Sequence, residues 1–262
     1  MLRLKRLYPQ LLPWLDVVAL FQWGALLLKF YFSGQLQLLI HPNYNLLVLG
    51  AGLGFLIFSS LRAKHLIYRR RSGVNDGPLQ HVTLFPPGLG SGLLLVSALL
   101  GFLIPPAVLA SETALQRGLN ESLPYTRTEA QSFYNPIPPE ERSLLDWVRT
   151  LNAYPEPDAY RDQKVNLKGF VVHSPTLPEN YLLISRFVIS CCAVDAYPIG
   201  LPVRLTTNRE DYPQDSWLQV QGRMATEELD DMPTAGLRHR RQLVIVAESI
   251  EEIPTPRDPY EF

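Results

Sequence analysis

The residues with the clearest capacity for chemistry are the two cysteines of the chain, Cys191 and Cys192, which are adjacent. Asp195 follows three residues after the second of them. Thiolates are preferred ligands of soft metal ions such as zinc, and a carboxylate can join them. Two other interpretations fit the same spacing: cysteines that only pack at a strand end, and a disulfide between neighbours, which needs a strained turn. The sequence leaves all three open.

Histidines and acidic residues elsewhere in the chain are further candidate ligands. His173 ends a predicted strand and can join the cysteines if that strand lies beside them. His239 is flanked by arginines, whose positive charge opposes a bound cation, and the acidic run at residues 227–231 is predicted to be a solvated loop. The candidate metal is therefore a soft ion such as zinc, with Cys191, Cys192, Asp195 and His173 as candidate ligands.

No pattern typical of an enzyme accompanies these residues. The chain has no phosphate-binding glycine loop, dinucleotide-binding glycine motif, HExxH motif or Ser-His-Asp grouping. Its 24 Lys and Arg residues are balanced by 25 Asp and Glu residues, for a net charge of -1. A nucleic-acid-binding protein usually carries a basic excess. We therefore expect neither an enzyme nor a nucleic-acid-binding protein.

The chain divides into two regions, an apolar one at residues 1–110 and a polar one that carries the candidate ligands. Three long apolar stretches lie at about residues 12–32, 44–61 and 88–110. About 20 mostly apolar residues are needed to cross a lipid bilayer as a helix. The sequence therefore predicts three transmembrane helices and a membrane anchor over residues 1–110. A GxxxG pattern from Gly50 to Gly54 would allow close helix packing in the second span, but glycine is common in membrane spans in any case.

The basic residues around these stretches predict the orientation of the anchor. Three precede the first stretch, none lies between the first and second, and five follow the second: Arg62, Lys64, Arg69, Arg70 and Arg71. Lysine and arginine accumulate in cytoplasmic segments of membrane proteins. The N-terminus and the second loop are therefore predicted to be cytoplasmic, and three spans then place everything after residue 110 outside the cytoplasm.

The polar region after Ser111 is predicted to be a tether followed by a domain. Prolines and polar residues at 111–139 predict a tether, and helical spacing of apolar residues predicts a helix at 138–152 within a domain at 140–262. Five strands are predicted at residues 164–173, 181–190, 201–206, 217–224 and 242–247, the last continuing towards 253. Gly169 and Gly222 predict bends or bulges. This pattern favours a mostly-β, OB-like small barrel, with an open sandwich as the alternative.

The segment RFVISCCAVDAYPIGLPVRL at 186–205, followed by WLQVQG, resembles the YcgQ-like family of membrane proteins, which has a domain of unknown function. Val194 departs from the alanine common in the family. The resemblance implies a subunit of a two-component permease complex, a multi-spanning permease subunit as partner, and the plasma membrane of a bacterium. Its most specific residues in this chain are Arg186, Cys191, Cys192, Ala193, Asp195, Ala196 and Gly200.

Two functions are therefore expected from the sequence. The first is an accessory permease subunit whose extracytoplasmic domain binds a solute or soft metal for its partner. The alternative is a structural or assembly membrane protein whose OB-like domain binds another protein or an envelope polymer, with no metal. Thiols that are buried, unreactive and metal-free in the folded domain would favour the alternative.

Overall fold

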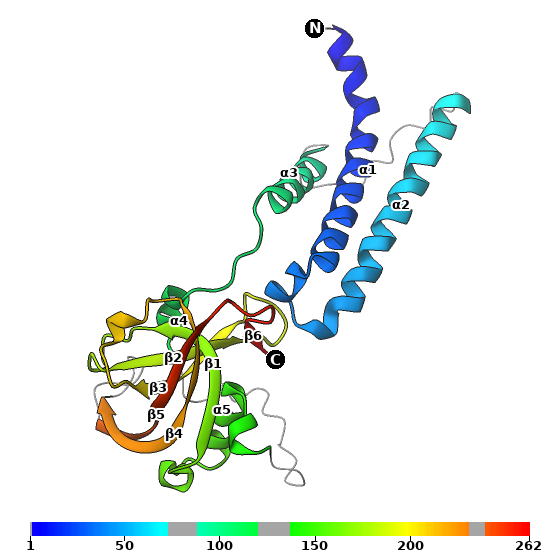
Figure 1. Cartoon of the computed structure of the whole chain (residues 1–262). Coiled ribbons are helices and arrows are strands. Elements are labelled where there is room, and N and C mark those ends of the chain that lie inside the picture. Colours follow the sequence, from blue (N-terminus) through cyan, green and yellow to red (C-terminus); the bar gives the residue numbers. More distant parts are fainter. Residues whose placement is uncertain (1, 73–87, 120–136, 231–238) are drawn as a thin grey trace. The chain divides into compact units, whose positions relative to one another are not determined.

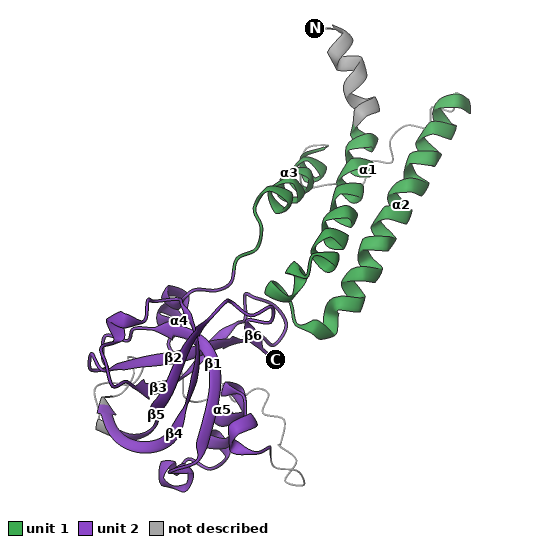
Figure 2. Cartoon of the chain, viewed as in Figure 1, with its two compact units in different colours: residues 1–107 green, residues 108–262 purple. Residues whose placement is uncertain are grey.

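A computed structural model describes residues 2–72, 88–119, 137–230 and 239–262 of the chain. The chain divides into two compact units, Met1–Ala107 and Val108–Phe262 (Figure 2). We call these the helical unit and the sheet unit and describe each by itself. The predicted tether at 111–139 is described in part, because residues 120–136 lie outside these ranges.

The helical unit consists of α1 (Leu2–Phe32), α2 (Asn45–Ser72) and α3 (Leu89–Leu103), with short 3-10 turns at Gln35–Leu38 and Pro42–Tyr44. The helix α1 packs against both α2 and α3. Among the residues that the structure describes, two helical stretches, Leu12–Phe32 and Pro42–Ser72, are long and apolar enough to cross a membrane. The second includes the basic residues that the sequence had assigned to a loop, because α2 continues through Arg71.

The helix α3 is shorter than the predicted span at 88–110. Its 15 residues cover about 22 Å at 1.5 Å per residue, less than the roughly 30 Å of a hydrocarbon core. Pro105 and Pro106 end the helix, because a proline disfavours helical geometry in the residue before it. Ile104, which precedes Pro105, is extended, with φ -107° and ψ 104°. The third span therefore stays a prediction.

The helices α1 and α2 approach each other closely at glycines other than those of the predicted GxxxG pattern. A Cβ atom on Gly24 would lie 3.0 Å from the carbonyl oxygen of Gly52, and one on Gly52 would lie 3.1 Å from Cδ2 of Leu28. In contrast, Gly50 and Gly54 have no atom within 4 Å of the position of a Cβ. The glycine of α2 that packs against α1 is thus Gly52, which lies between Gly50 and Gly54.

The charged residues of the first apolar stretch have partners inside the helical unit. The Ser91 hydroxyl of α3 donates a hydrogen bond to the Asp16 carboxylate. The Lys29 ammonium donates to the carbonyl oxygen of Phe102 at 3.2 Å and lies 5.3 Å from the centroid of that ring. Asp16 and Lys29 therefore both help to hold α3.

In the described residues of the sheet unit, two short helices accompany six strands (Figure 1). The helices are α4 (Ser111–Arg117) and α5 (Leu144–Ala153), and 3-10 turns lie at Pro139–Glu141, Pro157–Tyr160 and Arg209–Asp211. The strands are β1 (Lys164–Val172), β2 (Tyr181–Val188), β3 (Tyr197–Arg204), β4 (Trp217–Asp230), β5 (His239–Ile253) and β6 (Tyr260–Glu261). The five predicted strands are present, with β4 and β5 longer than predicted, and the two-residue β6 was not predicted.

The sheet has the order β1-β4-β5-β3-β2-β6, and β1 also pairs with β2. Residues 164–170 of β1 pair with β4, and residues 170–172 pair with β2. Gly169 lies beside this change of partner, where a Cβ atom would come within 2.6 Å of the carbonyl oxygen of Ser185. The absence of a side chain at Gly169 therefore lets β1 approach β2 closely, in agreement with the predicted bend.

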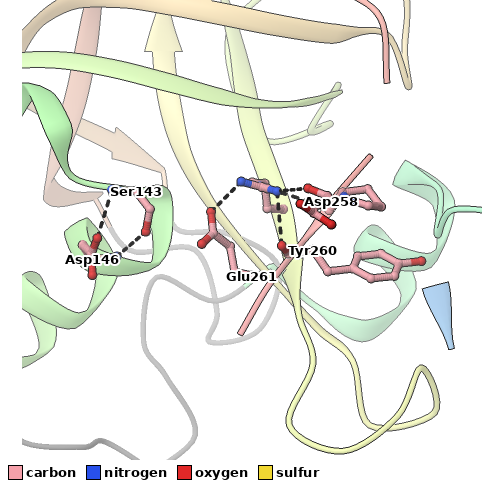
Figure 3. Close-up of polar contacts among 7 residues, drawn as sticks. Ser143, Asp146, Asp258, Tyr260 and Glu261 are labelled. Atoms are coloured by element: carbon pink, nitrogen blue, oxygen red, sulfur yellow. Dashed lines mark hydrogen bonds and ion pairs between the residues drawn. The ribbon is translucent and has the colours of Figure 1, made fainter. Parts of the chain in front are cut away.

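The helix α5 covers part of the sheet core with an apolar face. Its start is fixed by a capping box: the Ser143 hydroxyl accepts the N–H of Asp146 at 3.2 Å, and the Asp146 carboxylate accepts the N–H of Ser143 at 3.1 Å (Figure 3). Its buried residues pack against inward-facing strand residues in one core. That core includes Leu144, Leu145, Trp147, Val148, Val165, Leu167, Leu182, Ile184, Ile199, Leu201, Val203, Val220 and Ile245.

Candidate metal centre

The two cysteines lie in the connection between β2 and β3, in a turn that we call the CCAVD loop (residues 191–195). The carboxylate of Asp195 closes this turn, because its two oxygens accept the backbone N–H groups of Cys191 at 2.9 Å and Cys192 at 3.0 Å. The N–H of Asp195 in turn donates to the carbonyl oxygen of Cys192 at 3.0 Å. An aspartate that binds nearby backbone groups favours a tight turn, which explains its position three residues after the second cysteine.

The thiols and the carboxylate form one cluster of potential metal ligands. The Sγ atoms of Cys191 and Cys192 are 3.7 Å apart, and both cysteines are free. Cys191 is exposed and Cys192 is half-buried. One donor atom from each cysteine and from Asp195 lies within 4.8 Å of the others. The cluster could therefore hold a metal ion, and the exposure of Cys191 is not what a cysteine that only fills a core would show.

The protonation states of this cluster follow from its contacts. The hydrogen-bonded Asp195 carboxylate, followed by the neighbouring Cys192, raises the pKa of the Cys191 thiol to about 11. Burial raises the pKa of Asp195, but hydrogen bonds from the Cys191 thiol and from the N–H groups of Cys192, Cys191 and Ser190 outweigh it and hold that pKa below its usual range. At neutral pH the carboxylate is thus ionised while the Cys191 thiol keeps its proton.

A prediction about thiol reactivity follows. In chelator-treated protein at pH 7.5, Cys191 should be alkylated roughly a hundredfold more slowly than a free cysteine with a pKa near 8.5, because only the thiolate reacts. Asp195→Asn removes the largest cause of the raised pKa and should speed alkylation of Cys191 at least tenfold. Mass spectrometry of the alkylated chain over a pH series measures both rates. Asp211→Asn, in a different turn, is the matched control, and equal rates in all three proteins would contradict the prediction.

The CCAVD loop is tied to the helix α4. The guanidinium of Arg117, the last residue of α4, donates to the carbonyl oxygens of Ala196 and, at 3.5 Å, of Ala193. The two alanines singled out by the family resemblance thus contribute backbone acceptors on either side of Asp195. Because the Ala196 side chain is itself buried, a small residue fits this position.

Gly200 lies in β3 opposite Ser185 of β2 and leaves room for a buried hydroxyl. A Cβ atom on Gly200 would come within 2.7 Å of the Ser185 Oγ and 3.4 Å of the Leu119 Cδ2. Ser185 is fully buried. The glycine therefore serves the packing of the strands and does not contribute to the CCAVD loop directly.

Arg186 binds the C-terminal segment of the chain. Its guanidinium donates to the Glu261 carboxylate at 2.8 Å and to the carbonyl oxygens of Asp258 at 2.5 Å and Tyr260 at 3.2 Å (Figure 3). It also lies 5.7 Å from the ring centroid of Trp217. We call this arrangement the C-terminal clamp. Its effect is to hold β6 against β2, so the role of Arg186 is structural and not that of a ligand.

His173 is not part of the described cluster of donor atoms. Its Nε2 lies 2.9 Å from the carbonyl oxygen of Tyr212. The reason is the antiparallel pairing of β1 and β2, in which Val172 lies opposite Leu183. The end of β1 is therefore beside the start of β2, whereas the CCAVD loop follows the end of β2.

The acidic run at 227–231 is not the predicted solvated loop, because its residues 227, 228 and 230 belong to β4, while Asp231 lies outside the described residues. Glu227 accepts hydrogen bonds from Tyr181 and Arg204. Burial and the Glu227 carboxylate raise the pKa of Tyr181 to about 12. His239 starts β5 opposite Asp230. Strand pairing over this long hairpin outweighs the low β propensity of acidic residues.

Comparison with models of protein families finds two matches, which together cover most of the chain. The DUF1980 N-terminal domain matches residues 15–120, and the DUF1980 C-terminal domain matches residues 127–262. The chain belongs to the DUF1980 family, which is uncharacterised. Among curated proteins, no sequence matches it. The N-terminal match extends beyond the helical unit to include α4.

Proposed function

We propose that this DUF1980 chain is the accessory subunit of a two-component permease, in which the sheet unit lies outside the cytoplasm of a bacterium. There it binds a solute or soft metal ion for a multi-spanning partner subunit. The observation that carries the proposal is the exposed cluster of Cys191, Cys192 and Asp195 on a unit that follows apolar helices. Soft ligands displayed at a surface are suited to binding an ion that must be passed on.

The surface of the helical unit supports a membrane anchor. Large apolar side chains of α2 are exposed, including Leu46, Leu47, Leu53, Ile57, Phe58 and Leu61. Such a surface is unfavourable in water, and a lipid bilayer would cover it. Three arginines, Arg69, Arg70 and Arg71, lie in the last turn of α2. By the positive-inside rule this end is cytoplasmic, so the chain returns outwards through the predicted third span.

The strand pairings support the OB-like barrel within this proposal. β1 pairs with β4 and β2, β2 with β3, β3 with β5, and β5 with β4, so that the five long strands follow one another in a circuit. A circuit of this kind with five strands is typical of the OB-fold, which binds very different ligands on one fold. The fold therefore accommodates a binding function and does not identify the ligand.

The predicted topology can be tested with the native cysteines. Because Cys191 and Cys192 are the two cysteines of the chain, a membrane-impermeant maleimide applied to intact cells should label the protein without engineered residues. Labelling at pH 8.5 for a long interval compensates for the raised pKa of Cys191. Lysed cells give the maximum signal, and Cys191→Ser/Cys192→Ser gives the background. Labelling that requires lysis would place the sheet unit inside and contradict the proposal.

The subunit role is tested by copurification. The tagged full-length chain should retain a multi-spanning permease, identified by mass spectrometry, after solubilisation in mild detergent. The control is residues 108–262 fused to an unrelated membrane span, which lacks the helical unit that we expect to contact the permease. Loss of the permease from both proteins would contradict the subunit role and favour the alternative, a structural or assembly protein whose sheet unit binds another protein or an envelope polymer.

A further inference from the structure

The spacing of the donor atoms in the CCAVD loop distinguishes between metal geometries. Tetrahedral coordination with zinc–sulfur bonds of about 2.3 Å separates two sulfurs by about 3.8 Å. Linear two-coordinate binding with bonds of that length would separate them by roughly 4.6 Å. The Sγ atoms of Cys191 and Cys192 are 3.7 Å apart. The pair is therefore already spaced as one edge of a tetrahedral site, even though the residues are adjacent in the chain.

The carboxylate of Asp195 is held next to these sulfurs by the loop itself. Its oxygens accept the N–H groups of both cysteines, and a carboxylate oxygen keeps further acceptor sites after one hydrogen bond. The three donor atoms lie within 4.8 Å of one another, which is close enough for one ion to be held by all three. Asp195 thus holds the turn that positions the thiols and offers a third ligand.

Among the described residues, the cluster supplies three ligand side chains, one fewer than a closed structural zinc site. The ligands are also accessible, with Cys191 and Asp195 exposed and Cys192 half-buried. Val194, between the last two ligands, is 86% exposed, which is unusual for a large apolar side chain in the sheet unit. An exposed site with a free position binds an ion reversibly, and an incoming ligand can occupy that position.

We propose that the CCAVD loop is an exchange site for Zn²⁺, in which Cys191, Cys192 and Asp195 hold the ion and the fourth position accepts a donor from the molecule that delivers or removes it. This rests on the proposed function and names its substrate class as a borderline-soft divalent cation. Through the bond from Arg117 to the carbonyl of Ala196, the loop is joined to α4, the helix that begins at Ser111.

The binding part is tested by titrating Zn²⁺ alone into the detergent-solubilised full chain, in competition with a chromophoric chelator. One equivalent should bind, with affinity at least about tenfold lower in Cys191→Ser and in Cys192→Ser, and about 10–100-fold lower in Asp195→Asn. Val194→Ala, which keeps every donor, and His173→Gln should bind as the wild type does. Zn²⁺ binding that the cysteine variants leave unchanged would overturn the site.

A second measurement does not depend on the folding of variants. Bound Zn²⁺ should protect both cysteines of the unmutated chain from alkylation, as measured by mass spectrometry with and without the ion. Equal alkylation in the two samples would also overturn the site. Copurification with the permease is a separate experiment, so failure of the metal site and failure of the subunit role can be distinguished.

The free position is tested with Co²⁺ as a spectroscopic probe for Zn²⁺. The Co²⁺-loaded chain should show thiolate-to-cobalt charge-transfer bands and d–d bands of tetrahedral intensity. Added imidazole, which stands in for a donor from a carrier, should shift the d–d bands. Bands that imidazole leaves unchanged would show a closed site and overturn exchange, even if the metal binds through both cysteines.

Discussion

Replacing Arg186 by alanine should lower the free energy of unfolding of the sheet unit by about 3 kcal/mol. The side chains of Arg186 and Glu261 are 15% and 12% exposed, so the variant leaves a largely buried carboxylate without its cation. It also removes donors to the carbonyl oxygens of Asp258 and Tyr260. Urea denaturation of the full chain in detergent, followed by near-ultraviolet circular dichroism, measures the change.

The control for this prediction is Arg223→Ala. Arg223 also pairs with a glutamate, Glu248 at 3.0 Å, but the side chains are 49% and 60% exposed. An exposed ion pair contributes about 0–1 kcal/mol, because water screens the charges. Equal losses in the two variants would show that the C-terminal clamp adds no more than a surface ion pair.

The loss of unfolding free energy in Arg186→Ala should also depend on pH. Burial raises the pKa of Glu261 above its ordinary value of 4.5, while the charge of Arg186 acts in the opposite direction. Without Arg186 the folded-state pKa rises further, so the ionised carboxylate is penalised more at pH 7. As pH falls through the folded-state pKa values, Glu261 takes up a proton in both proteins. The difference in stability should therefore be largest near pH 7 and narrow towards pH 4.5.

Gly222→Ala should destabilise the sheet unit by about 3 kcal/mol or prevent its accumulation. A Cβ atom at this position would collide with the carbonyl oxygen of Val246 and lie 3.2 Å from the Cα of Ala247. These are backbone atoms of the paired strand, which cannot move without breaking the ladder. The pairing of β4 with β5 shifts register between Gln221 and Gly222, so the glycine permits the bulge that bends the long hairpin.

The matched control is Gln221→Ala, which changes an exposed side chain in the same bulge. It should change stability by no more than about 0.5 kcal/mol. Gly54→Ala in α2, where a Cβ meets no atom within 4 Å, is a second control for the general effect of alanine. Expression of Gly222→Ala at wild-type level with an unchanged unfolding midpoint would contradict the prediction.

Local patterns in the sequence determined the elements of this protein well. Two apolar stretches are long enough to span a membrane, and alternation located the five long strands within a few residues. At the third apolar stretch the helix α3 ends before Pro105, although the apolar composition continues to Ala110. The prediction of a solvated loop at Glu227 was wrong, because pairing with β5 keeps these acidic residues in a strand.

The cysteine cluster was also determined by the sequence, because adjacency brings Cys191 and Cys192 together whatever the fold. Asp195 is close for the same reason, since a carboxylate three residues away can close a turn on its own backbone. His173 is different: its distance from the cysteines depends on the direction in which β1 and β2 pair. Residues that meet through a short loop are therefore predictable, and those that meet across a sheet are not.

Tertiary structure alone decided the roles of the remaining motif residues. Arg186 binds Glu261, which is 75 residues away, and Arg117 binds Ala196, which is 79 residues away. No local spacing encodes such contacts, because they arise only when strand order and register bring distant segments together. The sequence by itself determined the donor atoms and the apolar helices. The fold decided that Arg186 holds the C-terminal segment, that Gly169 lets a neighbouring strand approach and that His173 lies apart from the cysteine cluster.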